Sequence, residues 1–523
     1  MPLFKKILIA NRGEIAVRVM RTCREMGIRS VAVYSDVDRE AVHVRAADEA
    51  WRLGPPPAIE SYLSVERVID AARSSGAQAL HPGYGFLSEN PLLSEACTTA
   101  GIVFIGPDPG PMERLGNKLQ ARKMAGEVGL EVLPGTTDAV SGVEEVLECG
   151  RSWGYPLLLK AAAGGGGRGM RVVRKAGQAA AELRAAQNEA RAAFDNPSVY
   201  VERYLENPRH VEIQVLSDRH GNSLALGERE CSIQRRHQKL IEESPSPAAG
   251  RKELEDAGQN AALLCAAAGY AGAATVEFLM DAGGKLTFME VNTRLQVEHP
   301  VTEARFGVDL VEQQIRIAAG EKLPEWLATR RPRGAAIEVR VYAEDPEEYF
   351  LPAPGVVEIL QLPEGPGVRC DSSIYQGYRV PAEYDPLLVK VITWGRSRPQ
   401  ALARMRRALS ECRISGLRST QPFLAWVLAD PEFRAGRYST GFVAERWDNR
   451  SVERKKRRRK STSRVTGAVP FRVRAALVAV ALEARRHGRS TAAETSTRLS
   501  PWRRVLDPQR GPGEGWPGRG GRG

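Results

Sequence analysis

Short apolar runs alternate with longer mixed segments along the first hundred residues of the chain. The runs "KKILIA" and "SVAVYSD" are typical of strands, and "GEIAVRVMRTCREMG" between them is predicted to be a helix that ends at Gly27 in the manner of a C-cap. A further unit of this kind follows through "SVERVIDAARSSGAQALHPGYGF", and "IVFIGP" adds another strand. Strands that alternate with helices predict an α/β fold with a doubly wound parallel sheet.

The pattern differs in the later part of the chain. A helix is predicted near "GNKLQARKMAGEVG", and it leads into a glycine-rich segment. From about Ala335, short strands follow one another in "AAIEVRVYAED", "GVVEILQL", "GVRCDS" and "LLVKVITWG". We therefore expect a separate, mainly antiparallel β domain there.

The glycine-rich segment "KAAAGGGGRGMRVV" contains the spacing G-x-G-x-x-G at Gly164, Gly166 and Gly169. In a dinucleotide-binding fold this spacing opens a helix, but here it joins two predicted strands, "YPLLLKAA" and "MRVVR". The Walker pattern is also excluded, because Gly-Lys-Ser/Thr is missing. A surface hairpin is the plain alternative. Lys160 and Arg168 favour a phosphate ligand instead, and we predict a flap over a nucleoside triphosphate.

A second hairpin carries two carboxylates. In "GAATVEFLMDAGGKLTFMEVN", the glycine pair signals a two-residue turn that pairs Ala282 with Lys285. Counting back from that turn places Glu277 opposite Glu290, and alternation places Asn292 on the same face as Glu290. Facing carboxylates repel each other, and a divalent cation with oxygen ligands would remove that cost. Two solvated glutamates on an exposed sheet are the alternative, but the apolar neighbours disfavour it.

The next segment, "NTRLQVEHP", places Arg294, Gln296 and Glu298 at alternate positions. An arginine can donate two hydrogen bonds to a small planar oxyanion, and a neighbouring carboxylate can act as a general base. Arginine and glutamate at this spacing also form ordinary salt bridges, so the segment alone does not decide between the two roles.

The net charge of +12 is concentrated in one part of the chain. Residues 451–523 contain 19 Lys and Arg against 5 Asp and Glu, a net charge of +14, so the first 450 residues are nearly neutral. The tail includes "RKKRRRK" and ends in "GPGEGWPGRGGRG". Such a tail could bind nucleic acid or a membrane, but we favour a solvated, low-complexity and largely disordered extension.

The remaining composition indicates a folded protein of the cytoplasm. No apolar run approaches the length of a membrane span, and the N-terminal apolar run is too short for a signal peptide. Seven scattered cysteines without CxxC pairs suggest a reducing compartment and no zinc site.

A string of motifs in a fixed order resembles one family, the biotin carboxylases of the ATP-grasp superfamily. The matching segments are "ILIANRGEIAVRV", "HPGYGFLSEN", "FIGP", "GNK", "KAAAGGGGRGMRVV", "ENPRHVEIQV", "QRRHQK" and "MEVNTRLQVEHPVTE". The resemblance runs from about Phe4 to Val443. It implies an N-terminal domain at 1–116, an ATP-grasp domain at 117–334 with a mobile glycine-rich lid at about 132–204, a C-terminal domain at 335–446 and a tail at 447–523.

The resemblance also implies a site for ATP with Mg²⁺ (or Mn²⁺). The implied nucleotide contacts are Lys118 and Lys160 at the phosphates, Gly166 and Gly167 in the lid, Glu202, Arg203, Tyr204 and Leu205 at the adenine, and Gln234, with His210 and His237 near the sugar or phosphates. Glu277, Glu290 and Asn292 match the family's metal positions, in agreement with the hairpin count.

The implied bicarbonate site consists of Lys239, Arg294, Gln296 and the backbone of Val297, with Glu298 as the general base. Arg340 would stabilise negative charge on biotin. Glu298 would deprotonate bicarbonate, which attacks the γ-phosphate of ATP. The resulting carboxyphosphate releases the CO₂ that biotin accepts.

The resemblance further implies that biotin is a substrate carried by another protein. Related multidomain enzymes attach biotin to the lysine of an Ala-Met-Lys-Met motif, and none of the nine methionines here is followed by lysine. We therefore expect a stand-alone subunit of an acetyl-CoA or acyl-CoA carboxylase, as in fatty acid biosynthesis. Its partners would be a biotin carboxyl carrier protein and carboxyltransferase subunits, and the chain itself would form a homodimer.

Two other functions are compatible with the motifs. A non-catalytic scaffold could keep the fold and bind nucleotide without turnover, but every matched catalytic position holds the expected residue type. Another ATP-grasp ligase would be expected to lack the set from Arg294 to Glu298, or Arg340, and neither is missing.

Overall fold

The computed structural model describes residues 3–162, 170–248 and 250–449 of the chain. The lid glycines Gly166 and Gly167, and the tail from Arg450 onward, lie outside the described residues. Residues 1–449 form one compact unit.

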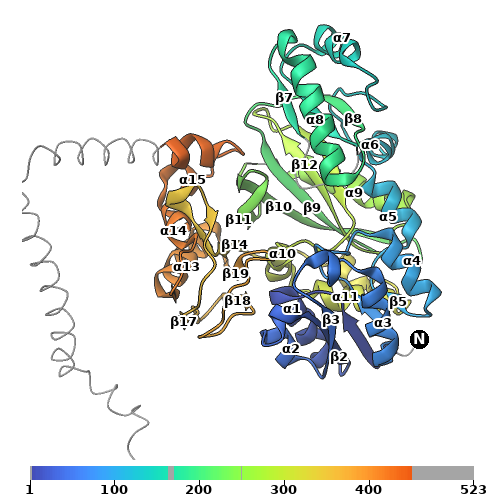
Figure 1. The fold of residues 1–523 in the computed structure, drawn as a ribbon. Helices are drawn as coiled ribbons and strands as arrows, with labels where there is room; N and C mark the ends of the chain where they lie inside the picture. The colour runs from blue at the N-terminus through green and yellow to red at the C-terminus, as the bar shows by residue number, and fades with distance from the viewer. Residues whose placement is uncertain (1–2, 163–169, 249, 450–523) are drawn as a thin grey trace, which may run out of the picture. The chain divides into compact units, whose positions relative to one another are not determined.

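The N-terminal part is the predicted doubly wound parallel sheet. Its strands lie in the order β3-β2-β1-β4-β5, and every neighbouring pair is parallel. The strands are β1 (Lys6–Ile9), β2 (Arg29–Ser35), β3 (Glu49–Gly54), β4 (Ala79–His81) and β5 (Val103–Phe104). The helices around it are α1 (Gly13–Glu25), α2 (Val42–Ala46), α3 (Val65–Ser75), α4 (Pro91–Thr99) and α5 (Pro109–Gly116) (Figure 1).

Alternate residues of β1 enter different cores, which shows that both faces of this sheet are covered. Ile7 and Ile9 pack in one apolar cluster with residues of α1 and of α11 (Leu310–Ala318). Leu8 packs in another cluster with residues of α3 and α4. Helix α1 ends as predicted, because Gly27 has φ +70° and the Ile28 N–H donates to the Cys23 carbonyl at 2.8 Å.

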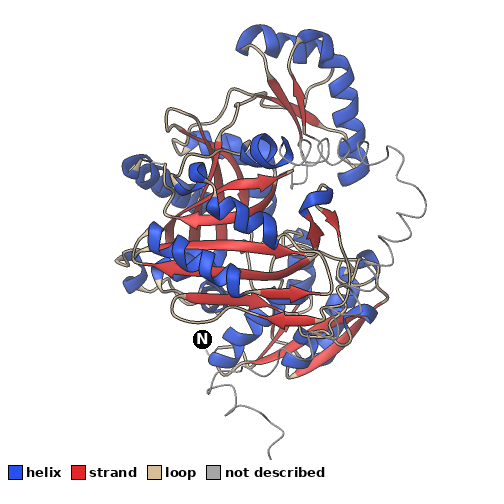
Figure 2. Ribbon diagram, turned by 90° about the vertical axis from the view of Figure 1, so that its left-hand side faces the viewer, coloured by secondary structure: helices blue, strands red, loops and turns tan. Residues whose placement is uncertain are grey.

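An eight-stranded antiparallel sheet forms the centre of the molecule (Figure 2). Its order is β13-β12-β9-β10-β11-β14-β19-β18. The strands are β9 (Arg209–Ser217), β10 (Ser223–Arg235), β11 (Gln238–Ser244), β12 (Gly272–Met280), β13 (Leu286–Asn292), β14 (Ala335–Tyr342), β18 (Val368–Ser372) and β19 (Leu387–Gly395). The longer helices among the elements beside it are α9 (Arg251–Ala267), α10 (His299–Phe306), α13 (Arg398–Glu411) and α14 (Gln421–Ala429).

The strands after residue 335 are antiparallel, as predicted, but the longer ones join the central sheet, and only the short pairs at Glu344–Pro352 and Ile359–Ser415 form small sheets of their own among the described residues. Strand β14 pairs with β11, and Glu242 lies opposite Glu338 in that ladder. Strands β14, β19 and β18 therefore extend the central sheet. Short elements complete this part: β15 (Glu344–Asp345), β16 (Leu351–Pro352), β17 (Ile359–Gln361), β20 (Arg413–Ser415) and α15 (Pro431–Arg434). The short helix α12 (Glu325–Ala328) precedes it.

A small three-stranded sheet carries the glycine-rich segment. Its order is β7-β6-β8, with β6 (Leu157–Ala161), β7 (Arg171–Val173) and β8 (Val199–Arg203) antiparallel. Helices α7 (Val143–Trp153) and α8 (Ala179–Phe194) contribute to its own apolar core. The glycines thus lie between two strands, as the sequence predicts, and no helix begins directly after them.

Helix α6 (Lys118–Glu127) confirms the helix predicted near "GNKLQ". The Asn117 side chain caps it, because Oδ1 accepts hydrogen bonds from the N–H groups of Leu119 and Gln120 at 3.1 Å. None of the helices in the described part of the chain combines the length and the apolar character that crossing a membrane requires.

Candidate active site

One cavity of about 850 Å³ lies between the N-terminal sheet, the small sheet and the central sheet. Of the predicted site residues that the structure describes, all but Glu298 line it. Glu298 lies directly behind the cavity wall and is fully buried. The cavity therefore collects residues from Lys118 to Arg340, more than 200 positions apart in the chain.

One end of the cavity carries the residues predicted to bind nucleotide. Lys118 begins α6, and its Nζ lies 3.6 Å from the carboxylate of Glu290. Lys160 comes from β6, lies 3.1 Å from the buried carboxylate of Glu202, and faces the ring of Tyr200. Arg203, Tyr204 and Leu205 follow Glu202 and also line this end. The two lysines thus reach the same cavity from different elements.

A two-residue turn between β10 and β11 places His237 in the cavity. Arg235 pairs with Gln238, and the residues between them, Arg236 and His237, have φ values of +48° and +66°. Such a turn normally contains glycine or asparagine, because other side chains cost energy in this conformation. Gln234 precedes the turn and lines the same wall.

Glu277 and Glu290 lie opposite each other on β12 and β13, as predicted from the hairpin. The predicted turn, however, is wrong by one residue. Asp281 and Lys285 close a loop of three residues, one more than predicted, in which Gly284 has φ +86°. Farther along the strands, the pairing shifts by one residue between the pairs Phe278–Phe288 and Glu277–Glu290. The two irregularities cancel, which is why the count reached the correct pair.

Four side chains contact the Glu277 carboxylate. They are Lys239 Nζ at 2.9 Å, His210 Nε2 at 2.9 Å, Asn292 Nδ2 at 2.9 Å and Gln296 Nε2 at 3.2 Å. Burial alone would raise the pKa of Glu277, but Lys239 and His210 outweigh it and hold that pKa below its ordinary value. Burial would likewise lower the pKa of His210, yet Glu277 raises it.

The donor set at this hairpin fits a hard divalent cation. Glu277, Glu290 and Asn292 offer oxygen atoms in one cavity wall, and oxygen ligands suit Mg²⁺ or Mn²⁺. Glu290 is the more accessible carboxylate, with 22% of its side chain exposed. The hairpin therefore has both the ligand type and the access that a metal bound to phosphate oxygens requires.

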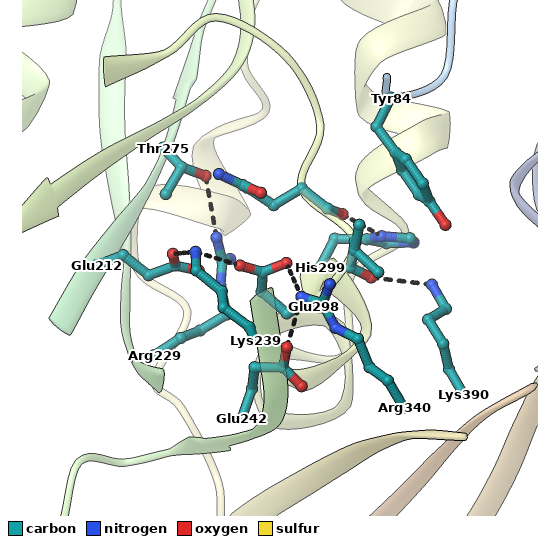
Figure 3. A network of polar contacts seen from close by, with 12 residues as sticks. Tyr84, Glu212, Arg229, Lys239, Glu242, Thr275, Glu298, His299, Arg340 and Lys390 are labelled. Carbon is teal, nitrogen blue, oxygen red and sulfur yellow. Dashed lines mark hydrogen bonds and ion pairs between the residues drawn. The ribbon is translucent and has the colours of Figure 1, made fainter. Parts of the chain in front are cut away.

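The centre of the cavity wall is a buried network of ion pairs around Glu298 (Figure 3). One oxygen of Glu298 accepts from Lys239 at 2.7 Å, and the other accepts from Arg340 at 2.8 Å. Lys239 also donates to Glu212 and Glu277. Burial would raise the pKa of Glu298, but Lys239, Arg340 and Arg229 together hold it well below its ordinary value. These cations therefore favour the ionised form of Glu298.

Arg294 occupies the predicted position beside this network. Its Nε donates to Glu89 at 2.8 Å, and its Nη groups donate to Gln296 Oε1 at 3.1 Å and Asn292 Oδ1 at 3.2 Å. The carbonyl of Val297 accepts a hydrogen bond from Lys390 at 2.9 Å. The predicted bicarbonate residues are thus contiguous in space.

The sequence-based prediction missed the residues that support this network. Arg229 is fully buried and donates to Glu212, Gln214, Thr275 and Thr302. The remaining supports that it missed are Arg122, Glu89, Glu242, Glu14 and Lys390. Charged residues inside apolar strands, as in "RHVEIQV" and "GERECSI", are the signal that could have identified Glu212 and Arg229.

Three family models cover most of the chain. The biotin carboxylase N-terminal domain matches residues 3–112, and the biotin carboxylase C-terminal domain matches residues 338–445. Between them, the ATP-binding domain of the carbamoyl-phosphate synthase L chain matches residues 117–326.

Curated relatives and solved structures agree with these models. Biotin carboxylase from Nostoc sp. is 50% identical over 442 residues, which span 84% of this chain and 99% of that protein. A pyruvate carboxylase subunit from Methanothermobacter thermautotrophicus is 48% identical over 85% of this chain and 90% of its own.

The biotin carboxylase domain of Hydrogenobacter thermophilus 2-oxoglutarate carboxylase, solved as a dimer with MgADP, ADP and bicarbonate, has a TM-score of 0.83 at 44% identity. It covers 85% of this chain and 98% of its own. Biotin carboxylase from Campylobacter jejuni has the same TM-score at 43% identity, over 84% of this chain and 99% of its own. The chain therefore belongs to the biotin carboxylase family.

Proposed function

We propose that this chain catalyses the ATP-dependent carboxylation of biotin carried by a separate protein. ATP, bicarbonate and the biotinyl carrier would give ADP, phosphate and the carboxybiotinyl carrier. One observation carries the proposal: a single cavity contains the predicted nucleotide residues, the predicted bicarbonate residues and Arg340. Relatives solved with MgADP and bicarbonate support it.

The buried network explains how Glu298 would act as a base. In the ligand-free site, Lys239 and Arg340 hold its pKa low, which makes it a weak proton acceptor. A bicarbonate anion that draws Lys239 toward itself removes part of that stabilisation, while Arg294 helps to bind the anion. Glu298 then gains basicity only when its substrate is present, and it can take the proton of bicarbonate.

Phosphoryl transfer would take place beside the two lysines. The bicarbonate oxygen attacks the γ-phosphate while Lys118 and Lys160 offset the negative charge. Glu277, Glu290 and Asn292 would hold Mg²⁺ or Mn²⁺, which when bound supplies further positive charge at the phosphates. Carboxyphosphate then breaks down to CO₂ and phosphate. The phosphate takes the ureido proton of biotin, and the resulting enolate attacks CO₂ beside Arg340.

The partners follow from this half-reaction. We propose a biotin carboxyl carrier protein, carboxyltransferase subunits and a homodimer of this chain. The relatives include a propionyl-CoA carboxylase alpha chain and a pyruvate carboxylase subunit, so the final acceptor is determined by the carboxyltransferase rather than by this cavity.

All seven cysteines are unpaired, which supports a cytoplasmic location. The matched family ranges support the domain limits 1–116, 117–334 and 335–446.

The test is ADP release by the purified chain with MgATP, measured with and without bicarbonate and free biotin. Stimulation that requires both is the expected result. Nucleotide binding without stimulated turnover would favour a scaffold, and repeating the assay with the biotinyl carrier would separate a scaffold from an enzyme that needs its partner.

A further inference from the structure

The Arg340 guanidinium lies between two buried carboxylates. The same nitrogen, Nη2, is 2.8 Å from Glu298 and 2.5 Å from Glu242 (Figure 3). Both glutamates are fully buried. Within the described residues, Arg340 is the one cation that lies within 4 Å of Glu242. Glu242 therefore has no other ionic role in this part of the site.

The two carboxylates differ in what the reaction demands of them. Glu298 is the proposed base, so it loses its negative charge each time it accepts a proton, and its attraction for Arg340 weakens at that moment. A buried guanidinium with no carboxylate beside it is strongly destabilised. Arg340 consequently needs a second carboxylate beside it while Glu298 is protonated.

We propose that Glu242 is a positioning residue that holds Arg340 in place for biotin throughout the catalytic cycle. This inference rests on the proposed carboxylation of biotin. Glu242 is absent from the cavity lining, and the cation of the described residues within 4 Å of its carboxylate is Arg340, which lines the cavity. It acts on biotin only through Arg340.

The cross-strand neighbour, Glu338, provides a matched control. It lies opposite Glu242 in the β11–β14 ladder, and it is equally buried. The oxygens of both glutamates lack a hydrogen bond of regular geometry among the described residues, so the difference lies in the ion pair: Arg340 Nη2 is 2.5 Å from Glu242, and no cation of the described residues lies within 4 Å of Glu338. Burial raises the pKa of both carboxyls, and it raises that of Glu338 well above its ordinary value.

The experiment compares Glu242→Gln and Glu338→Gln in the full chain, with ATP or free biotin varied. We expect the KM for biotin to rise about tenfold in Glu242→Gln, as loss of one charge-assisted contact would give, while the KM for ATP stays within about twofold. Glu338→Gln should behave as the wild type. A wild-type KM for biotin in Glu242→Gln, or an equal rise in both KM values, would overturn the proposal.

A double-mutant cycle separates positioning from general damage. In an Arg340→Lys background, Glu242→Gln should add little to the defect, because its effect passes through the arginine. Additive effects would contradict the proposal. If Glu242→Gln does not fold, Glu242→Asp is used in the same cycle, judged by the same criterion.

A pH profile gives a further readout. Burial raises the pKa of Glu242 to about 7, with Arg340 opposing the shift. The groups that face it are Arg340 and Glu338 on β14, Glu298 before α10, and Lys239 on its own strand. The wild-type KM for biotin should rise as the pH falls below about 7, and this dependence should be absent in Glu242→Gln. If the KM for biotin changes with pH in the same way in the wild type and in Glu242→Gln, Glu242 is not the positioning residue.

A wild-type chain that shows no biotin-dependent turnover would instead refute the proposed function.

Discussion

The two ends of the cavity differ in how completely their charges are paired before substrate binds. Around Glu298, Lys239 and Arg340 each lie within 3 Å of a carboxylate, and the Glu298 carboxylate between them is 0% exposed. At the nucleotide end, Glu290 is partly exposed, and its one ion pair within 4 Å among the described residues is with Lys118, at 3.6 Å. The carboxylation centre is thus organised in advance, whereas the nucleotide end has groups available for a metal and phosphates.

The largest expected effect is on turnover at the paired end. Glu298→Ala should lower bicarbonate-dependent ADP release by roughly 10²–10⁴-fold, because it removes the proposed base. Nucleotide binding, measured by calorimetry, should remain. A variant that cleaves ATP at the wild-type rate in the presence of bicarbonate would remove Glu298 from the mechanism.

The next effect is on stability at the same end. Arg229→Met should destabilise the fold by about 3–5 kcal/mol in urea unfolding, because it leaves Glu212 buried without its arginine. The control is Arg151→Met, whose exposed pair with Glu148 should contribute less than about 1 kcal/mol. Equal losses in the two variants would show that the paired end is not specially stabilised.

A comparison within the metal hairpin is expected to give smaller differences. Glu277→Gln and Glu290→Gln should both weaken metal-dependent turnover. Only Glu277→Gln should also cost about 1–3 kcal/mol of stability, because four side chains contact that carboxylate. Mg²⁺ titrations of ADP release and thermal melts measure the two effects. Unchanged activity in Glu290→Gln would exclude that residue from the metal site.

The smallest expected effect is a pH dependence of stability. The folded-state pKa of Glu242 is raised from 4.5 to about 7, so the folded state binds a proton more tightly than the unfolded state between these values. Stability should therefore fall as the pH rises from about 4.5 to 7. Glu242→Gln lacks this titration, so its free energy of unfolding should rise by roughly 1–3 kcal/mol relative to that of the wild type as the pH goes from 5 to 8. Urea unfolding of both proteins at several pH values measures this change. A difference in unfolding free energy that stays the same at every pH would contradict the prediction.

Local patterns predicted the parts of the fold that depend on neighbouring residues. The β1–α1–β2 unit follows from apolar runs and from the glycine at position 27. The Glu277–Glu290 pair was predicted correctly although the turn was predicted one residue too short. The pair came out right because a bulge in the ladder compensates for the longer loop. The β11–β14 ladder could not be predicted in this way, since its strands are about 100 residues apart in the chain.

The candidate site was predicted mainly where side chains belong to a recognisable motif. Lys239, Arg294 and Arg340 were assigned by resemblance, and the structure brings them together. Glu242 and Arg229 lie on strands where a charged residue suggests a solvent-facing position, and only the packed structure shows that both are buried. Gly166 and Gly167 remain predictions, because they lie outside the described residues.

The small β7-β6-β8 sheet has a consequence for product release. In the described part of the chain, none of its strands belongs to the central sheet, yet it supplies Lys160 to a cavity whose other lysines come from α6 and β11. The position of Lys160 relative to those lysines therefore depends on the segments that connect the small sheet to the central sheet, not on a continuous ladder. Substitutions that stiffen or loosen these connecting segments are expected to change the rate of ADP release, even where they touch no nucleotide.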